Sequence, residues 1–157
     1  MKRHSGKWYG VMLHHTAGNT SEKIEQIRKA HINNNHWGDI GYHYVIEVDP
    51  DNRSSKIVKG RSLSFQGAHA GVDKYNNGYV GVCVPGNYDK NKMPDWLYHQ
   101  LLGHICHIMK KPEINAYGFL GHREVKATAC PGRYINLDKM RYDLSVKLKK
   151  PVKPIKL

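Results

Sequence analysis

The segment Tyr79–Val84, with the sequence Tyr-Val-Gly-Val-Cys-Val, contains no charged or strongly polar residue. A strand that is exposed on one face alternates apolar and polar residues, whereas a continuous apolar run of this length is typical of a strand buried on both faces. Such a strand needs a packed layer on each side of its sheet. We therefore expect an α/β domain with Tyr79–Val84 near the centre of its sheet.

The rest of the chain supplies strands and helices in alternation. Further strands are expected at residues 7–15, 42–48 and 117–120, and residues 56–59 form the hairpin partner of 42–48 across the turn signal at 49–52. Helices are expected from Thr20 or Ser21 to about 33–35, from 94 to 109 and from 137 to 148. The pattern predicts a single α/β domain with a central mixed sheet flanked by helices on both faces.

With 157 residues the chain is long enough for one domain, which we place at residues 1–148. Residues 149–157 alternate basic residues with prolines and are expected to form a solvated tail or linker. The basic start of the chain is followed by only three consecutive apolar residues, fewer than the roughly seven of a secretory signal, and no stretch approaches the roughly 20 apolar residues of a membrane span. We expect a monomer made in a cytoplasm.

The charge of the chain favours polyanionic partners. Lys and Arg number 25 against 13 Asp and Glu, for a formal net charge of +12. Nucleic acid, anionic membranes and the anionic polymers of a cell envelope would all be attracted. Because no predicted helix carries a clustered Lys/Arg face, we do not expect nucleic acid to be the partner.

The three cysteines differ in their surroundings. An odd number of cysteines without a secretory signal argues against a disulfide framework. Cys83 and Cys106 fall in apolar segments, where free cysteines usually belong to the core. Cys130 instead lies in a loop rich in Gly, Pro and Thr, eight residues after His122, which makes it a candidate metal ligand.

Several of the eleven histidines lie at predicted strand ends or in loops, where catalytic groups concentrate: His14, His15, His43, His69 and His122. One Cys and two His are a recognised ligand set for a catalytic zinc, which keeps a fourth position open for water. Spacing supports His122 with Cys130 as ligands, but it does not choose between His14 and His15 as the third.

Five segments, in this order, resemble the motifs of the zinc-dependent N-acetylmuramoyl-L-alanine amidases, a family that includes phage amidase endolysins and whose fold the peptidoglycan recognition proteins share. Together they span about residues 8 to 134, nearly the whole domain. The segments are residues 11–18 (Val-Met-Leu-His-His-Thr-Ala-Gly), 37–46 (Trp-Gly-Asp-Ile-Gly-Tyr-His-Tyr-Val-Ile), 60–61 with 67–70 (Gly-Arg and Gly-Ala-His-Ala), 81–88 (Gly-Val-Cys-Val-Pro-Gly-Asn-Tyr), and 122–125 with 130–132 (His-Arg-Glu-Val and Cys-Pro-Gly).

The resemblance implies zinc held by His14, His122 and Cys130. His15 would then be a packing residue, because strand alternation turns it to the other face of the sheet. A purely structural zinc would need a fourth protein ligand. His43 or His69 would have to supply it, so that alternative stays open.

The resemblance also implies the substrate, the amide that joins the lactyl group of N-acetylmuramic acid to L-Ala in bacterial peptidoglycan. Zinc activates water and polarises the carbonyl in such reactions. Tyr42 would orient the water or donate to the oxyanion, unless it is an ordinary strand tyrosine. Thr128, where several relatives carry Lys, would donate one hydrogen bond. The residues expected to line the substrate groove are Trp37, His69, Tyr75 and Asn87, although Trp37 as a core aromatic is an equal alternative.

These inferences suggest a phage endolysin that is made in the host cytoplasm and acts on the cell wall after release, with its positive charge attracted to anionic envelope polymers. A bacterial autolysin is a second reading. A noncatalytic peptidoglycan-binding module of the same fold is a third, but such modules typically lack the Cys ligand, and Cys130 is present here.

Overall fold

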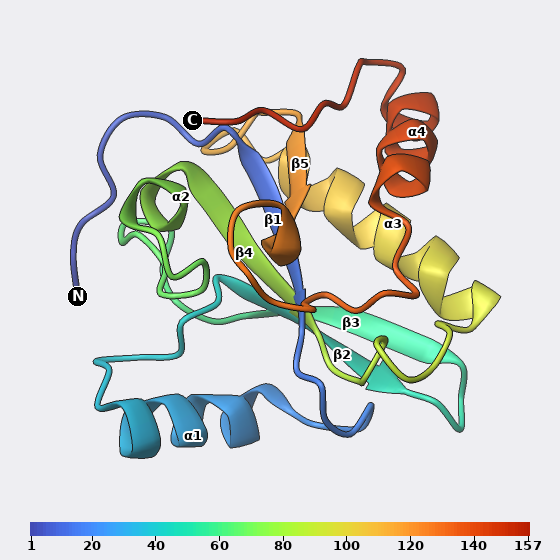
Figure 1. Cartoon of the computed structure of the whole chain (residues 1–157), viewed down its shortest axis with the longest axis horizontal. Coiled ribbons are helices and arrows are strands. Elements are labelled where there is room, and N and C mark those ends of the chain that lie inside the picture. Colours follow the sequence, from blue (N-terminus) through green and yellow to red (C-terminus); the bar gives the residue numbers. More distant parts are fainter.

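Strand β4 (Tyr79–Val84) is the middle strand of a five-stranded sheet with the order β3-β2-β4-β1-β5, in a computed structural model that describes residues 1–157 (Figure 1). Strands β1 (Gly10–His15) and β2 (Tyr44–Asp49) pair with β4 in parallel, and β5 (Gly118–Gly121) pairs in parallel with β1. Strand β3 (Ser54–Lys59) is the antiparallel partner of β2. All six residues of β4 are buried, which confirms the central position predicted from their apolar character.

Helices cover both faces of this sheet. The larger apolar core joins one face to α3 (Asp95–Met109) and α4 (Leu137–Leu148), and the opposite face packs against α1 (Ile24–Asn35) and α2 (Asp73–Gly78) (Figure 1). A short 3-10 helix, η1 (His122–Glu124), follows β5 directly. The mixed sheet and its two helical layers agree with the predicted fold class. No helix combines the length and the apolar character that crossing a membrane requires.

The face that carries α1 and α2 has an interrupted core. One small cluster surrounds Met12 of β1 and Tyr75 of α2, and another joins Ile24 and Ile27 of α1 to Cys83 of β4. His14 lies between the two clusters, because it follows Met12 on the same face of β1 and pairs in register with Cys83. The fold therefore opens a polar site in the middle of an otherwise apolar layer.

Helix α1 begins at Ile24, later than the predicted start at Thr20 or Ser21. The Asn19 carbonyl accepts a hydrogen bond from the Glu22 amide and closes a turn before the helix. The first helical amide, that of Ile24, donates to Oε2 of the buried Glu47 at 2.8 Å, so a side chain from β2 fixes the helix start. Local capping rules could not have indicated this long-range partner.

Residues 149–157 were predicted as a solvated tail or linker; most of their side chains are exposed, but the segment is docked on the domain. Val152 is buried in the main core. The Lys153 carbonyl accepts from the Phe119 amide at 2.9 Å, and the Tyr79 hydroxyl donates to the Ile155 carbonyl at 2.6 Å. Figure 1 shows the C-terminal segment running beside β5. Because β5 is an edge strand with unpaired backbone groups, a neighbouring extended segment is stabilised by pairing with it.

The docking of this segment predicts a large difference between two Val→Asp substitutions. Val152→Asp should lower the free energy of unfolding by about 2–4 kcal/mol, because it places an unpaired carboxylate in the core. Val146→Asp makes the same chemical change at a position that is 62% exposed, and it should cost about 1 kcal/mol or less. Urea denaturation followed by circular dichroism measures both. Equal, small costs would show that the segment is solvated.

Candidate metal centre

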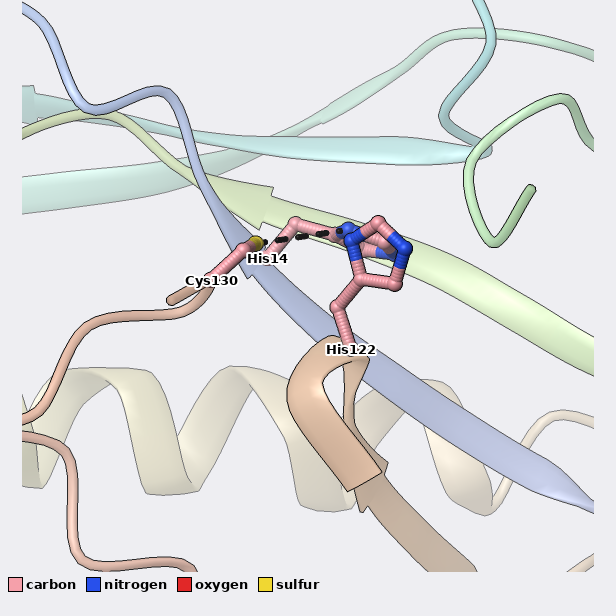
Figure 2. A group of neighbouring side chains, drawn as sticks. All are labelled: His14, His122 and Cys130. Atoms are coloured by element: carbon pink, nitrogen blue, oxygen red, sulfur yellow. Dashed lines mark hydrogen bonds between the residues drawn. The ribbon is translucent and has the colours of Figure 1, made fainter. Parts of the chain in front are cut away.

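The three predicted ligands lie together at one end of the sheet. His14, His122 and Cys130 each offer a ligand atom, and these atoms all lie within 4.8 Å of one another (Figure 2). Leu13 of β1 and Gly121 of β5 are partners in the parallel register, so the residues that follow them, His14 and His122, emerge side by side. Cys130 reaches the same place from the loop beyond η1, with its Sγ 3.6 Å from Nδ1 of His14.

His14 is almost completely buried, with 1% of its surface exposed. Its Nε2 lies 2.9 Å from Nδ1 of His69, which leaves its Nδ1 on the side of Cys130. Burial, followed by the neighbouring rings of His69 and His122, holds the pKa of His14 well below its ordinary value. The ring is therefore neutral at physiological pH, which is the form that ligates metals.

His122 is half-buried, and its Nε2 lies 2.9 Å from the Ala70 carbonyl oxygen. A carbonyl oxygen can only accept, so Nε2 carries the proton and the lone pair on Nδ1 is available to a metal. Burial is the main cause that lowers the pKa of His122, and the nearby charge of Lys126 lowers it further.

The loop between His122 and Cys130 is closed by Arg123. Its backbone amide donates to the Cys130 carbonyl at 2.8 Å, and its guanidinium donates to the carbonyl oxygens of Gly132 and Ile135 at 2.7 and 2.6 Å. These three bonds fix the separation of the two ligands that share the loop.

Glu124 and Arg141 anchor the other side of this loop. The Glu124 carboxylate pairs with the Arg141 guanidinium at 2.9 and 3.0 Å and accepts from the Gly121 amide at 2.9 Å. Arg141 also donates to the Phe119 carbonyl of β5. Glu124 therefore has a structural role, and it is not free to act as a general base.

The Cys130 side chain is partly buried behind the His15 backbone. The His15 amide donates to Sγ at 3.4 Å. Burial raises the pKa of the Cys130 thiol to about 11, opposed by the His15 amide and the charge of Arg123. Without a metal the thiol is protonated at neutral pH, so metal binding has to release this proton.

Two neutral imidazole nitrogens and one cysteine sulfur fit zinc, for which such mixed sets are common. Neither alternative histidine supplies a fourth ligand. His43 is fully buried, accepts from the Gly81 amide on Nδ1 and donates to the Phe65 carbonyl from Nε2. His69 contacts His14 through Nδ1 and the Tyr79 carbonyl through Nε2. Three protein ligands and a free fourth position are the arrangement of catalytic rather than structural zinc sites.

Tyr42 lies next to this centre, with its ring centroid 5.2 Å from that of His14. Burial, and then the neighbouring Cys83 and Cys130 thiols, raise its pKa well above the ordinary value. The phenol is therefore protonated at neutral pH and can donate a hydrogen bond.

Thr128 is exposed, and its Oγ1 accepts from the Cys130 amide at 3.3 Å. Its hydroxyl hydrogen is left free to be donated, as the predicted role requires. Lys126, which the sequence motifs did not single out, lies in the same loop with its Nζ 3.3 Å from the Gly71 carbonyl. Its positive charge lies near His122. The only signal for this in the sequence is the position of Lys126 in the loop between His122 and Cys130.

Trp37 and Asn87 lie in two different loops. Trp37 is half-buried and packs edge-on against His31, with 4.9 Å between ring centroids. It belongs to none of the three apolar core clusters. Asn87 closes the turn after β4 by accepting from the amides of Asp89 and Lys90. Whether these two residues contact a substrate stays a prediction.

Two predicted groove residues are wrong, because both side chains are buried. His69 is 7% exposed and lies behind His14, and Tyr75 is 6% exposed within the small apolar cluster. The Tyr75 hydroxyl accepts from the amide of Leu157 in the docked C-terminal segment. Neither side chain can therefore line a substrate groove.

Comparisons with known proteins identify the family and the fold of the chain. Residues 4–133 match the family model described as N-acetylmuramoyl-L-alanine amidase. Peptidoglycan-recognition protein SC2 of Drosophila melanogaster is 30% identical over 133 residues, which cover 80% of this chain and 68% of that protein. The crystal structure of Drosophila peptidoglycan recognition protein SD aligns with a TM-score of 0.74 and 25% identity, covering 90% of this chain and 83% of that one.

A bacterial enzyme shares the same fold. The N-acetylmuramoyl-L-alanine amidase LysC from Clostridium intestinale aligns with a TM-score of 0.72 and 21% identity, covering 96% of this chain and 94% of that one. The match to the family model extends over most of the chain and includes all three candidate ligands. The chain belongs to the N-acetylmuramoyl-L-alanine amidase family.

Proposed function

We propose that this chain is a zinc-dependent hydrolase that cleaves the amide between the lactyl group of N-acetylmuramic acid and L-Ala in bacterial peptidoglycan. The observation that carries the proposal is the convergence of His14, His122 and Cys130 without a fourth protein ligand. The fourth position is where a catalytic zinc site receives water or substrate. Membership of the amidase family supports the choice of bond.

Zinc in this site would supply a nucleophile at neutral pH and polarise the amide carbonyl. The chain itself holds the three ligand atoms in place through β1, β5 and the loop closed by Arg123. Tyr42, protonated and next to His14, would donate a hydrogen bond to the oxyanion that forms as the amide is attacked. Thr128 would offer a second, uncharged donor from the rim of the site.

A noncatalytic peptidoglycan-binding module is the second candidate, because the curated relatives carry the name of recognition proteins. Binding alone does not require an intact set of metal ligands. The complete set of two histidines and one cysteine therefore favours hydrolysis.

We also propose that the protein acts as a phage endolysin, with the net charge of +12 drawing it to anionic polymers of the envelope. Bacteria that express it internally should keep their turbidity until their membrane is permeabilised, and should then lyse. Lysis without permeabilisation would contradict the proposal that the protein is an endolysin.

Binding of the protein to the cell wall should weaken steeply as salt is added, because salt screens a charge-driven attraction.

Digestion of purified peptidoglycan tests the proposed bond. Mass spectrometry should find intact glycan strands together with free stem peptides that begin with L-Ala, and a chelator should stop their release until zinc is restored. Wall that binds the zinc-loaded protein but yields no new L-Ala amino groups would favour the binding module.

Cys130→Ser should reduce both the zinc content and the release of L-Ala to background, because a serine hydroxyl does not replace a thiolate as a zinc ligand. Cys106→Ser is the control, since Cys106 belongs to the main core, away from the metal centre. Metal analysis and amine release are measured on the same preparations. Full activity of Cys130→Ser would remove Cys130 from the site.

Tyr42→Phe should lower kcat by about 100- to 1000-fold while zinc affinity stays unchanged, because only the hydroxyl donor is lost. Tyr142→Phe makes the same change on α4 at a side chain that is 63% exposed, and it should leave kcat as in the wild type. Steady-state kinetics on a soluble muropeptide measures both variants. An unchanged kcat for Tyr42→Phe would assign Tyr42 a packing role only.

A further inference from the structure

One short loop, residues 67–70, contacts both histidine ligands on the side away from the metal position. Nε2 of His14 lies 2.9 Å from Nδ1 of His69, and Nε2 of His122 lies 2.9 Å from the carbonyl oxygen of Ala70. His69 and Ala70 are adjacent in the sequence, whereas the two ligands come from β1 and η1. Figure 2 shows the two ligand rings arriving from these separate elements beside Cys130.

The hydrogen bonds of His69 determine which nitrogen of His14 carries the proton. Nε2 of His69 lies 3.0 Å from the Tyr79 carbonyl oxygen, which can only accept, so Nε2 is protonated. His69 is 7% exposed and no carboxylate contacts it, so the ring carries a single proton, on Nε2, and its Nδ1 is an acceptor. His14 must therefore donate from Nε2, which leaves the lone pair of its Nδ1 facing Cys130.

His122 reaches the same tautomer by a different bond. The Ala70 carbonyl can only accept, so the proton of His122 lies on Nε2 and its Nδ1 is free. Both ligand rings thus present Nδ1, and in both cases the partner of Nε2 belongs to residues 67–70.

Asn76 of α2 fixes this loop. Its Oδ1 accepts from the amides of His69 and Ala70 at 2.9 and 2.8 Å, and its carbonyl accepts from the Gly67 amide at 2.9 Å. Two glycines leave room for the His69 ring. A Cβ added at Gly67 or Gly81 would come within 2.3 or 2.5 Å of its Cδ2. The ring therefore occupies a slot from which it cannot easily move.

We propose that residues 67–70, held by Asn76, select the Nε2-protonated tautomer of both His14 and His122 and thereby present both Nδ1 atoms to the metal. His69 and Asn76 are positioning residues and do not touch the substrate or the metal. This inference rests on the proposed function in that zinc is the metal bound. Groups that orient histidine ligands in this way typically contribute about 10- to 100-fold to metal affinity.

Substitutions at Asn76 test the loop without touching a ligand. Asn76→Leu removes the acceptor for two amides and should weaken zinc binding by about 10- to 100-fold. Asn76→Asp keeps an acceptor oxygen and should restore most of the affinity. Asn77→Ala is the matched control, because the Asn77 side chain holds Ser5 rather than the loop. Competition with a chromophoric zinc chelator measures all four proteins.

Substitutions at His69 test the contact with His14. His69→Leu leaves Nε2 of His14 without an acceptor and should also weaken zinc binding, whereas His69→Gln offers an amide oxygen in place of Nδ1 and should lose less. Thermal unfolding of each variant separates this effect from a loss of folding, and only variants that unfold cooperatively are compared. Zinc affinity within experimental error of the wild type in both Asn76→Leu and His69→Leu would overturn the proposal.

The tautomers themselves are observable in the wild-type protein. Long-range 15N–1H NMR of the metal-free protein should show His14 and His122 protonated on Nε2 only. In the His69→Leu variant, His14 should become a mixture of tautomers. Protonation of His14 on Nδ1 in the wild type would overturn the proposal. If the wild type binds no zinc at all, the proposed function fails, while the NMR measurement still decides the tautomers.

Discussion

The parallel register of β1 with β5 is the constraint on which the metal centre depends. Leu13 and Gly121 are paired across the two strands, so His14 and His122 leave the sheet as neighbours even though they are more than 100 residues apart in sequence. The strands approach each other closely at their start, where a Cβ on Gly10 would lie 1.8 Å from the Gly118 carbonyl oxygen. A shift of one residue in this register would turn one of the two ligands to the opposite face.

A polar centre within a buried layer is stable only if its hydrogen bonds are made, since an unpaired buried polar group costs about 1–3 kcal/mol. The buried histidines of this layer, His14, His43 and His69, all have hydrogen-bond partners. The one buried side-chain nitrogen or oxygen without a partner is the Tyr44 hydroxyl on the opposite face. The same bonds that satisfy these rings also orient them. The same hydrogen bonds therefore support both the stability of this layer and the binding of a metal.

The errors made from the sequence share a physical cause. His69 was expected to line the substrate groove, but Gly67 and Gly81 leave space for its ring behind His14. Residues 149–157 were read as solvated because of their Lys and Pro content. In the structure the edge of β5 provides backbone partners, and Val152 is buried in the core. The His69 ring contacts His14, which is 55 positions away in the sequence, and the C-terminal segment pairs with β5, so no local pattern could reveal either partner.

The sequence by itself determined the central strand β4, the α/β class and the spacing of His122 and Cys130 on one loop, because apolar periodicity and loop length are local properties. Only the tertiary structure decided which nitrogen of each histidine faces the metal position. That choice depends on the His69 ring and the Ala70 carbonyl, which lie 55 and 52 positions away in the sequence from the ligands they contact. A tautomer is set by the partner of the other ring nitrogen, and the partner is known only once the chain has folded.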